Sequence, residues 1–202
     1  MKRKYTTIIS DLGGVFLNRG VWLFWDHLQE EHKIPVETAK LAFLKNYKQY
    51  FSGYITEEEF WVNLLSEINL KQDWKLLREK LLGFFEINKE TSDIYRNLRK
   101  KGFKMVLLCD QSKEWWPILD KKFEISSQFD FVVVSALIGL HKPSPEIYKY
   151  TLKKSKSVAK ESIFTDDIDY NLTPAKDLGV DTILFENSKQ FKKELQKRID
   201  IQ

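Results

Sequence analysis

Polar side chains follow three apolar, β-branched runs of the chain, at the point where each run ends. The carboxylates are those of Asp11, of Asp110 after Cys109, and of Asp166 before Asp167. If the runs are neighbouring parallel strands, their carboxyl ends share one edge of a sheet and these groups converge there. Gathered carboxylates repel one another unless a cation lies among them. Ligation by a few carboxylate oxygens, with positions left for water and phosphate, is typical of Mg²⁺.

Two further features of the sequence belong to this predicted cluster. Gly13 and Gly14 follow Asp11 directly, and glycines there let the backbone turn tightly and approach a ligand closely. Lys142 stands in the loop GLHKPSP, residues 139–145. We expect its ammonium group to supply a fixed positive charge beside the carboxylates.

Five short apolar runs predict the strands that must position these residues. They cover residues 5–9, 103–108, 131–134, 162–165 and 181–185. A helical pattern precedes the second run, with Thr91 or Ser92 expected as its cap and Gly102 as its end, and further helical patterns follow the third, fourth and fifth runs. Alternating strands and helices predict an α/β fold with a Rossmann-like, doubly wound, parallel five-stranded sheet.

The long stretch between the first two strands has a different pattern. From residue 21 to residue 82 the apolar spacing is helical and no strand pattern occurs, and Thr56 with Glu59 forms a capping box. We therefore expect an α-helical cap subdomain over residues 17–88, inserted into a core domain made of residues 1–16 and 89–202. Most tryptophans of this stretch are expected in the cap core; they are Trp22, Trp25, Trp61 and Trp74. Trp115 and Trp116, just after the second strand, are expected to face the cleft.

The composition limits the compartment and the partners. The 202 residues are 43% hydrophobic and 31% charged with a net charge of +4, and no concentrated basic stripe of the kind that binds nucleic acid occurs. The longest uncharged apolar run, residues 131–140, is far shorter than the ~20 residues of a membrane helix. Cys109 is the only cysteine, which suits a reducing compartment. We expect a cytoplasmic protein that binds neither nucleic acid nor membrane; its oligomeric state does not follow from the sequence.

Four segments together resemble the haloacid dehalogenase superfamily, specifically its phosphatase-like members with a helical cap inserted after the first strand. The segments are IISDLGGVFLN, MVLLCDQS, GLHKPSPEIY and IFTDDIDYNLTPAKDLGV, and their order and spacing fit over nearly the whole chain. The resemblance implies a hydrolase with a Rossmann-like core.

The family's roles are assigned here by matching positions. Asp11 matches the nucleophile that forms an aspartyl-phosphate intermediate. The implied ligands of Mg²⁺ are the carboxylates of Asp11 and Asp166 and the carbonyl of Gly13, supported by Asp167. Lys142 matches the lysine that neutralises the nucleophile and the transferring phosphoryl group. Two further positions match the part of the family's site that binds the substrate phosphate, Cys109 and Asp110.

The chain departs from the family pattern at two places. Family phosphatases usually have a second aspartate two residues after the nucleophile, acting as general acid and base, and here that residue is Gly13. Such proton transfer contributes roughly 10²- to 10⁴-fold, so its loss predicts a slow enzyme or one in which water or the substrate supplies the proton. Cys109-Asp110 replaces the usual Ser-Asn or Thr-Asn. A thiol is a weaker donor than a hydroxyl and a carboxylate repels phosphate, so both changes predict weaker phosphate binding unless Asp110 is paired.

Three functions remain open at this point. The first is a Mg²⁺-dependent phosphomonoesterase acting on a small phosphorylated metabolite, whose identity the sequence does not give. The second is a catalytically weak or inactive relative that binds a ligand or partner, which Gly13 and Asp110 favour. The third is a haloacid dehalogenase, in which halide leaves without a proton; Asp166 and Asp167 argue against it, because a metal-free site does not need these carboxylates.

Overall fold

The strand that leads to Asp11 is the centre of the sheet. The structure, a computed structural model, describes residues 4–199, and within them five parallel strands pair in the order β3-β2-β1-β4-β5. This confirms the predicted fold class. Because β1 lies between β2 and β4, the order of the strands reverses there, which is where doubly wound folds bind ligands. The strands are β1 (Thr7–Ser10), β2 (Lys104–Cys109), β3 (Phe131–Val134), β4 (Ser162–Asp166) and β5 (Asp181–Leu184).

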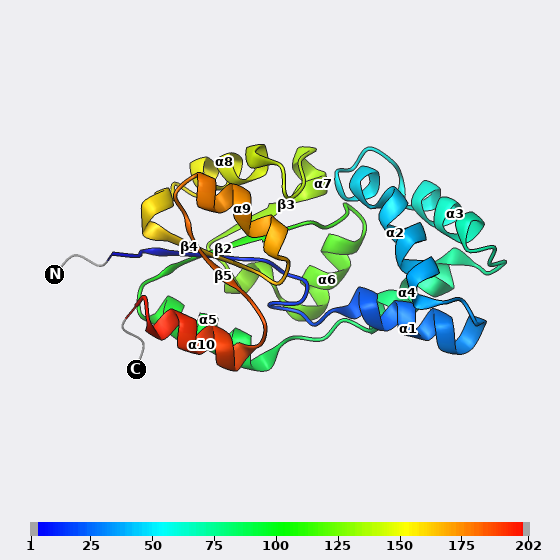
Figure 1. Cartoon of the computed structure of the whole chain (residues 1–202), viewed down its shortest axis with the longest axis horizontal. Coiled ribbons are helices and arrows are strands. Elements are labelled where there is room, and N and C mark those ends of the chain that lie inside the picture. The colour runs from blue at the N-terminus through cyan, green and yellow to red at the C-terminus, as the bar shows by residue number, and fades with distance from the viewer. Residues whose placement is uncertain (1–3, 200–202) are drawn as a thin grey trace.

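Both faces of the sheet are covered, because successive strand residues point to opposite faces. Ile8 belongs to one apolar cluster and Ile9 to another. The cluster of Ile9 contains residues of α8 (Pro145–Lys154) and α9 (Asp169–Asp177), and that of Ile8 contains residues of α5 (Lys89–Lys100) and α10 (Ser188–Gln196). Figure 1 shows these helix pairs on opposite sides of the sheet.

Four helices fill the stretch between β1 and α5. Residues 20–83, all of which the structure describes, contain no strand. These helices gather at the end of the molecule far from both termini (Figure 1). The predicted capping box at the start of the third is formed, with Glu59 N–H on the Thr56 hydroxyl and Thr56 N–H on the Glu59 carboxylate. The limits of the cap, residues 17–88, stay a prediction. The helices are α1 (Gly20–His32), α2 (Val36–Phe51), α3 (Glu57–Glu67) and α4 (Trp74–Gly83).

The start of α5 differs from the prediction. The capping residue is Asn88, whose side-chain oxygen accepts from the Thr91 N–H at 3.3 Å, so Thr91 and Ser92 lie inside the helix. Asparagine is among the strongest N-cap residues, and its oxygen reaches the third helical N–H, as here. The Thr91 hydroxyl lies 3.0 Å from that of Ser188 instead, which joins α5 to α10.

The short helix α6 (Trp115–Phe123), which the sequence reading did not predict, joins the core to α2 and α3. Its Trp115 is fully buried among the rings of Tyr50, Phe51, Phe60 and Trp61. The indole N–H of Trp115 donates to Glu57 Oε1 at 2.6 Å. One continuous apolar cluster therefore runs from the sheet into the four inserted helices. The remaining elements are α7 (Ser135–Ile138), η1 (Ser126–Gln128) and η2 (Ala159–Glu161).

Candidate active site

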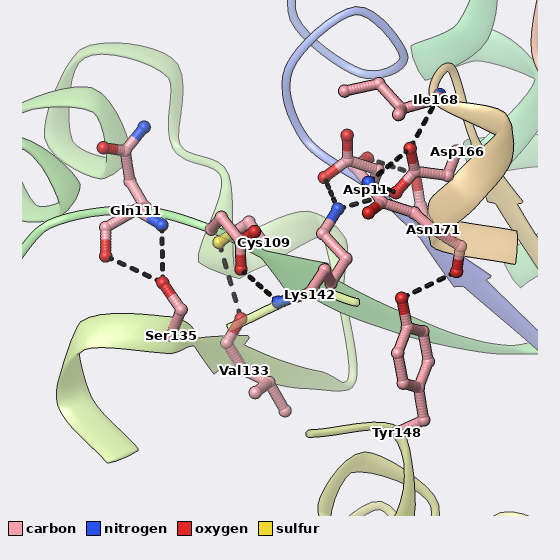
Figure 2. Close-up of polar contacts among 12 residues, drawn as sticks. Asp11, Cys109, Gln111, Val133, Ser135, Lys142, Tyr148, Asp166, Ile168 and Asn171 are labelled. Atoms are coloured by element: carbon pink, nitrogen blue, oxygen red, sulfur yellow. Dashed lines mark hydrogen bonds and ion pairs between the residues drawn. The ribbon is translucent and has the colours of Figure 1, made fainter. Parts of the chain in front are cut away.

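A lysine and two carboxylates meet at the carboxyl edge of the sheet. Lys142 Nζ lies 2.6 Å from Asp11 Oδ1 and 2.7 Å from Asp166 Oδ2, and all three side chains are buried. Asp11 follows β1 and Asp166 ends β4, the strand beside it, so the sheet itself brings them together. Figure 2 shows the lysine reaching between the two carboxylates. Charged groups so far out of water are stable only when paired in this way.

The loop of Lys142 is held from both sides. The backbone N–H of Lys142 donates to Asp110 Oδ1 at 3.1 Å, and the hydroxyl of Tyr54, in the loop after α2, donates to the Gly139 carbonyl at 2.9 Å. Asp110 Oδ2 in turn accepts from the hydroxyl of Tyr47 on α2 at 3.4 Å. Asp110 is therefore paired, and its carboxylate orients the backbone that carries Lys142.

Asn171, to which the sequence reading gave no role, fixes the orientation of Asp166. Its amide Nδ2 lies 3.0 and 3.1 Å from the two carboxylate oxygens of Asp166, and the Ile168 N–H donates to Asp166 Oδ1 at 2.9 Å. The hydroxyl of Tyr148 donates to the Asn171 carbonyl at 2.6 Å. The signal available in the sequence was an asparagine five residues after Asp166, at the start of a helix.

Asp167 completes the carboxylate cluster and is paired from the side of the inserted helices. Arg19 Nε donates to Asp167 Oδ2 at 2.7 Å, and the guanidinium of Arg19 lies over the ring of Trp22 at 4.3 Å. Gly14 makes room for this carboxylate: its φ is +79°, and a Cβ at this position would lie 2.1 Å from Asp167 Oδ2. Only glycine fits here.

The cluster is suited to a small divalent cation. Oxygens of Asp11, Asp166 and Asp167 lie within 4.8 Å of one another, and hard oxygen ligands are those that Mg²⁺ takes. Burial, and then the neighbouring carboxylates, raise the pKa of Asp11, against the effect of Lys142. Burial would lower the pKa of Lys142, but the surrounding carboxylates outweigh it and raise that pKa, so the ammonium form is favoured. Asp11, Asp166 and Asp167 are the aspartates that would hold the ion. Gly13, a predicted carbonyl ligand, lines the same cavity.

Gly13 is not required by the backbone. It has no positive φ, and a Cβ added to it would meet nothing within 4 Å. Of the two adjacent glycines, Gly14 is the one with a positive φ. A side chain is therefore absent at Gly13 without a steric reason.

The thiol of Cys109 is hydrogen-bonded to the neighbouring strand β3. Cys109 is fully buried, its thiol donates to the Val133 carbonyl at 3.4 Å, and burial raises the pKa of that thiol well above its usual range. Cys109 is not among the described residues that line the cavity, whereas Asp110 is. The role in phosphate binding assigned to both by resemblance stays a prediction.

A cavity of about 220 Å³ opens over the cluster. Its floor carries Asp11, Lys142 and Asp167, and its walls come largely from α1 and α2. Of the two tryptophans expected to face the cleft, Trp115 lines the cavity from α6, whereas Trp116 is not among its described lining residues. Trp22, expected in the cap core, is about half exposed and lines the cavity instead. This follows from its position on α1, where it covers Arg19 and not the interior.

Fold and site together define a doubly wound α/β protein with an anionic cluster and a buried lysine at the strand ends. A family model described as haloacid dehalogenase-like hydrolase matches residues 27–185. The chain belongs to this family of hydrolases.

Several curated proteins are similar in sequence. Bifunctional epoxide hydrolase 2 of Rattus norvegicus is 28% identical over 211 residues, which is 93% of this chain and 37% of the relative. The Mus musculus protein of the same name is 31% identical over 169 residues, 74% of this chain and 30% of the relative. Glyceraldehyde 3-phosphate phosphatase of Pyrococcus abyssi is 28% identical, covering 78% of this chain and 69% of the relative. The chain thus spans less than two-fifths of the epoxide hydrolases.

Solved structures share the fold. An HAD family enzyme of Bacteroides thetaiotaomicron, in complex with magnesium and inorganic phosphate, superposes with a TM-score of 0.69 at 22% identity, covering 91% of this chain and 95% of that one. The L-2-haloacid dehalogenase of Xanthobacter autotrophicus gives a TM-score of 0.67 at 14% identity, covering 96% and 83%. At such identities the likeness shows the fold alone. No helix between residues 4 and 199 has the length and apolar character to cross a membrane.

Proposed function

We propose that the protein is a Mg²⁺-dependent phosphomonoesterase that acts on a small phosphorylated metabolite through an aspartyl-phosphate on Asp11. The observation that carries the proposal is the ammonium group of Lys142 between Asp11 and Asp166, with Asp167 in the same cluster. Such a site holds a nucleophilic carboxylate beside fixed positive charge, as attack on a phosphate anion requires. The similarity to a glyceraldehyde 3-phosphate phosphatase supports the same reaction class.

The chain's own residues supply the following steps. An oxygen of the Asp11 carboxylate attacks phosphorus, and the bond from phosphorus to the ester oxygen breaks. Water gives the leaving oxygen its proton, because Gly13 offers none. A second water then attacks the phosphorus of the aspartyl-phosphate, which releases inorganic phosphate and restores Asp11. Lys142 offsets negative charge on Asp11 and on the transferring group throughout. Mg²⁺ bound by the three aspartates would supply the further positive charge that a phosphate anion needs beside them.

The alternatives predict different behaviour. A dehalogenase does not need Asp166 and Asp167 in a cluster, and an inactive binding protein needs no nucleophile. The absence of a side chain at Gly13 still favours a weak catalyst. The cytoplasmic location stays a prediction, based on the single cysteine, Cys109.

A panel of phosphate monoesters, assayed with Mg²⁺ and with EDTA, tests the proposal. We expect hydrolysis that requires Mg²⁺ and that is abolished in Asp11→Asn, because an amide of nearly the same shape is too poor a nucleophile. Thermal unfolding of the variant checks that the fold is intact. Turnover by Asp11→Asn at the parent's rate, or no hydrolysis of any ester by the parent, would overturn the proposal.

A further inference from the structure

The cavity above Asp11 has two chemically different parts. Its floor is charged, with carboxylates and Lys142. Its upper wall is made of apolar side chains from α1 and α2, from the segment that follows α4, and from α6. This wall and the floor belong to one cavity. The apolar residues are Val21, Trp25, Phe43, Phe51, Phe85 and Trp115.

Three polar side chains of the wall, those of Asn18, Tyr47 and Gln111, already make hydrogen bonds within the protein, and Arg19 is paired through Nε with Asp167. Asn18 donates to the Phe84 carbonyl at 2.9 Å and accepts from the Glu86 N–H at 3.2 Å. The Tyr47 hydroxyl donates to Asp110, and Gln111 Oε1 accepts from the Ser112 N–H at 3.1 Å. Sugar hydroxyls entering this space would lose water and gain few hydrogen bonds, which is unfavourable.

Large apolar and aromatic side chains are exposed around the cavity opening, next to the partly exposed Arg19. Trp22 on α1 is 51% exposed, Leu44 on α2 is 48% exposed, and Tyr170 on α9 is 63% exposed, and all three line the cavity. Exposed apolar side chains that gather around one opening mark a binding site for apolar groups.

We propose that the phosphate ester recognised here carries an apolar alcohol, an arylmethyl or short branched alkyl group, and not a sugar or nucleoside. This rests on the proposed phosphatase activity and names its substrate class. The phosphate lies at Lys142 and the apolar group lies against Phe43 and Leu44. The volume of about 220 Å³ is below the roughly 300 Å³ at which drug-sized pockets begin, so the alcohol is small.

Binding of two phosphonates in the presence of Mg²⁺ tests the inference without catalysis. Methylphosphonate and benzylphosphonate share the anionic group and differ by a phenyl ring. Burial of roughly 110 Å² of ring surface at about 25 cal/mol per Å² corresponds to a tighter Kd on the order of a hundredfold. Equal affinities measured by calorimetry would overturn the inference.

Kinetics supply the second test and separate the two proposals. Benzyl phosphate and glycerol 3-phosphate both release a primary alkoxide, so a difference in kcat/KM reports recognition. We expect benzyl phosphate to be favoured on the order of a hundredfold by the same burial of a ring. If glycerol 3-phosphate is the better substrate, the substrate class is wrong and the phosphatase stands. If benzylphosphonate binds tightly and no ester is hydrolysed, the ligand class stands and the phosphatase is wrong.

Two leucines of α2 provide a matched pair of variants. Leu44 lines the cavity, and Leu41 is 59% exposed on the same helix but does not line it. Leu44→Ser should lower kcat/KM for benzyl phosphate about tenfold, because the ring loses its contact with the leucine side chain. The same substitution should change kcat/KM for glycerol 3-phosphate less than about twofold. Leu41→Ser should leave both values at the parent's level. Equal effects of the two substitutions would count against the apolar wall.

Discussion

Gly13 and Gly14 stand side by side in the chain, and their surroundings are different. Gly13 has ordinary backbone angles and free space where a Cβ would lie, whereas Gly14 has a positive φ and lies against Asp167. The roles of these two adjacent glycines can therefore be tested separately by substitution. Gly13 governs whether the site has a proton donor, and Gly14 governs where a carboxylate of the cluster lies.

Gly13→Asp should raise kcat, because it places a carboxyl group where the chain now has none. The expected gain approaches the ~10²-fold low end of general acid–base effects, for an ester with a poor leaving group. Gly13→Asn is the control, since the amide has nearly the same shape as the carboxyl group but cannot act as a general acid or base. Steady-state kinetics of both variants decide the matter, and equal rates for Asp and Asn would show that proton transfer does not limit the parent.

Gly14→Ala should weaken Mg²⁺ binding, because a Cβ 2.1 Å from Asp167 Oδ2 displaces that carboxylate. Gly102→Ala is a matched control: Gly102 has a φ of +80°, yet a Cβ there would meet nothing within 4 Å. Both variants should lose about 1 kcal/mol or more of stability through backbone strain. Only Gly14→Ala should raise the Mg²⁺ concentration needed for half-maximal activity. An unchanged Mg²⁺ requirement would mean that Asp167 moves without consequence.

The types and positions of the main site residues could be predicted from the sequence, but the hydrogen-bond partners of two of them could not. The chemistry of Asp11, Lys142, Asp166 and Asp167 is evident from residue type and from their places after apolar runs. The partner of Asp167 is not, because Arg19 lies 148 residues away and nothing in its surroundings marks it as paired. The same holds for the contact of Asp110 with Tyr47.

Helix α6 is the element that ties the inserted helices to the core. Its Trp115 contributes a ring to the aromatic cluster and a hydrogen bond to the buried carboxylate of Glu57, which also pairs with Arg78 at 3.2 Å. The four inserted helices are therefore attached through packing and through a charge-assisted hydrogen bond. A lid that opened fully would have to break both.

Trp115→Phe should destabilise the protein by about 2–3 kcal/mol, because it keeps an aromatic ring but removes the donor from a buried carboxylate. Trp116→Phe on the same helix is the control, since Trp116 is only partly buried, and we expect it to cost less than about 1 kcal/mol. Urea unfolding with an unchanged m-value measures both. Similar losses in the two variants would argue against a special role for the contact with Glu57.

The strands could be predicted from the sequence because each is a buried run that depends on local pattern alone. Helix α6 was not predicted, although Trp115, Leu119 and Phe123 follow a helical spacing, because it has only nine residues and carries Pro117 in its first turn. It begins where the Ser112 hydroxyl accepts from the Trp115 N–H at 3.0 Å, and its buried face packs on residues of α2 and α3 more than fifty positions earlier. Packing against residues distant in the sequence stabilises such a helix, and this packing cannot be inferred from the helix's own segment of sequence.

The carboxylates of the cluster lie where the inserted helices meet the carboxyl edge of the sheet, and they outnumber the cations paired with them. Three carboxylates of the cluster face two cations, Lys142 and Arg19. Burial and then Asp166 raise the pKa of Asp167, and burial raises the pKa of Asp11 against the opposing effect of Lys142, with Asp166 and Asp167 adding to the rise. An added divalent cation would therefore stabilise the folded chain by binding to a site that unfolding destroys.

Mg²⁺ should raise the thermal midpoint of the parent. At a hundred times its Kd, a ligand of the folded state adds about 2.7 kcal/mol, which corresponds to roughly 5–11 °C in a chain of this size. Asp166→Asn should lose most of this shift, whatever its midpoint without metal, because a charged carboxylate ligand is replaced by a neutral amide. Asp169→Asn is the control, since Asp169 is exposed and lies outside the cluster, and it should keep the full shift. If Asp166→Asn and Asp169→Asn respond alike to Mg²⁺ and EDTA, the ion binds elsewhere.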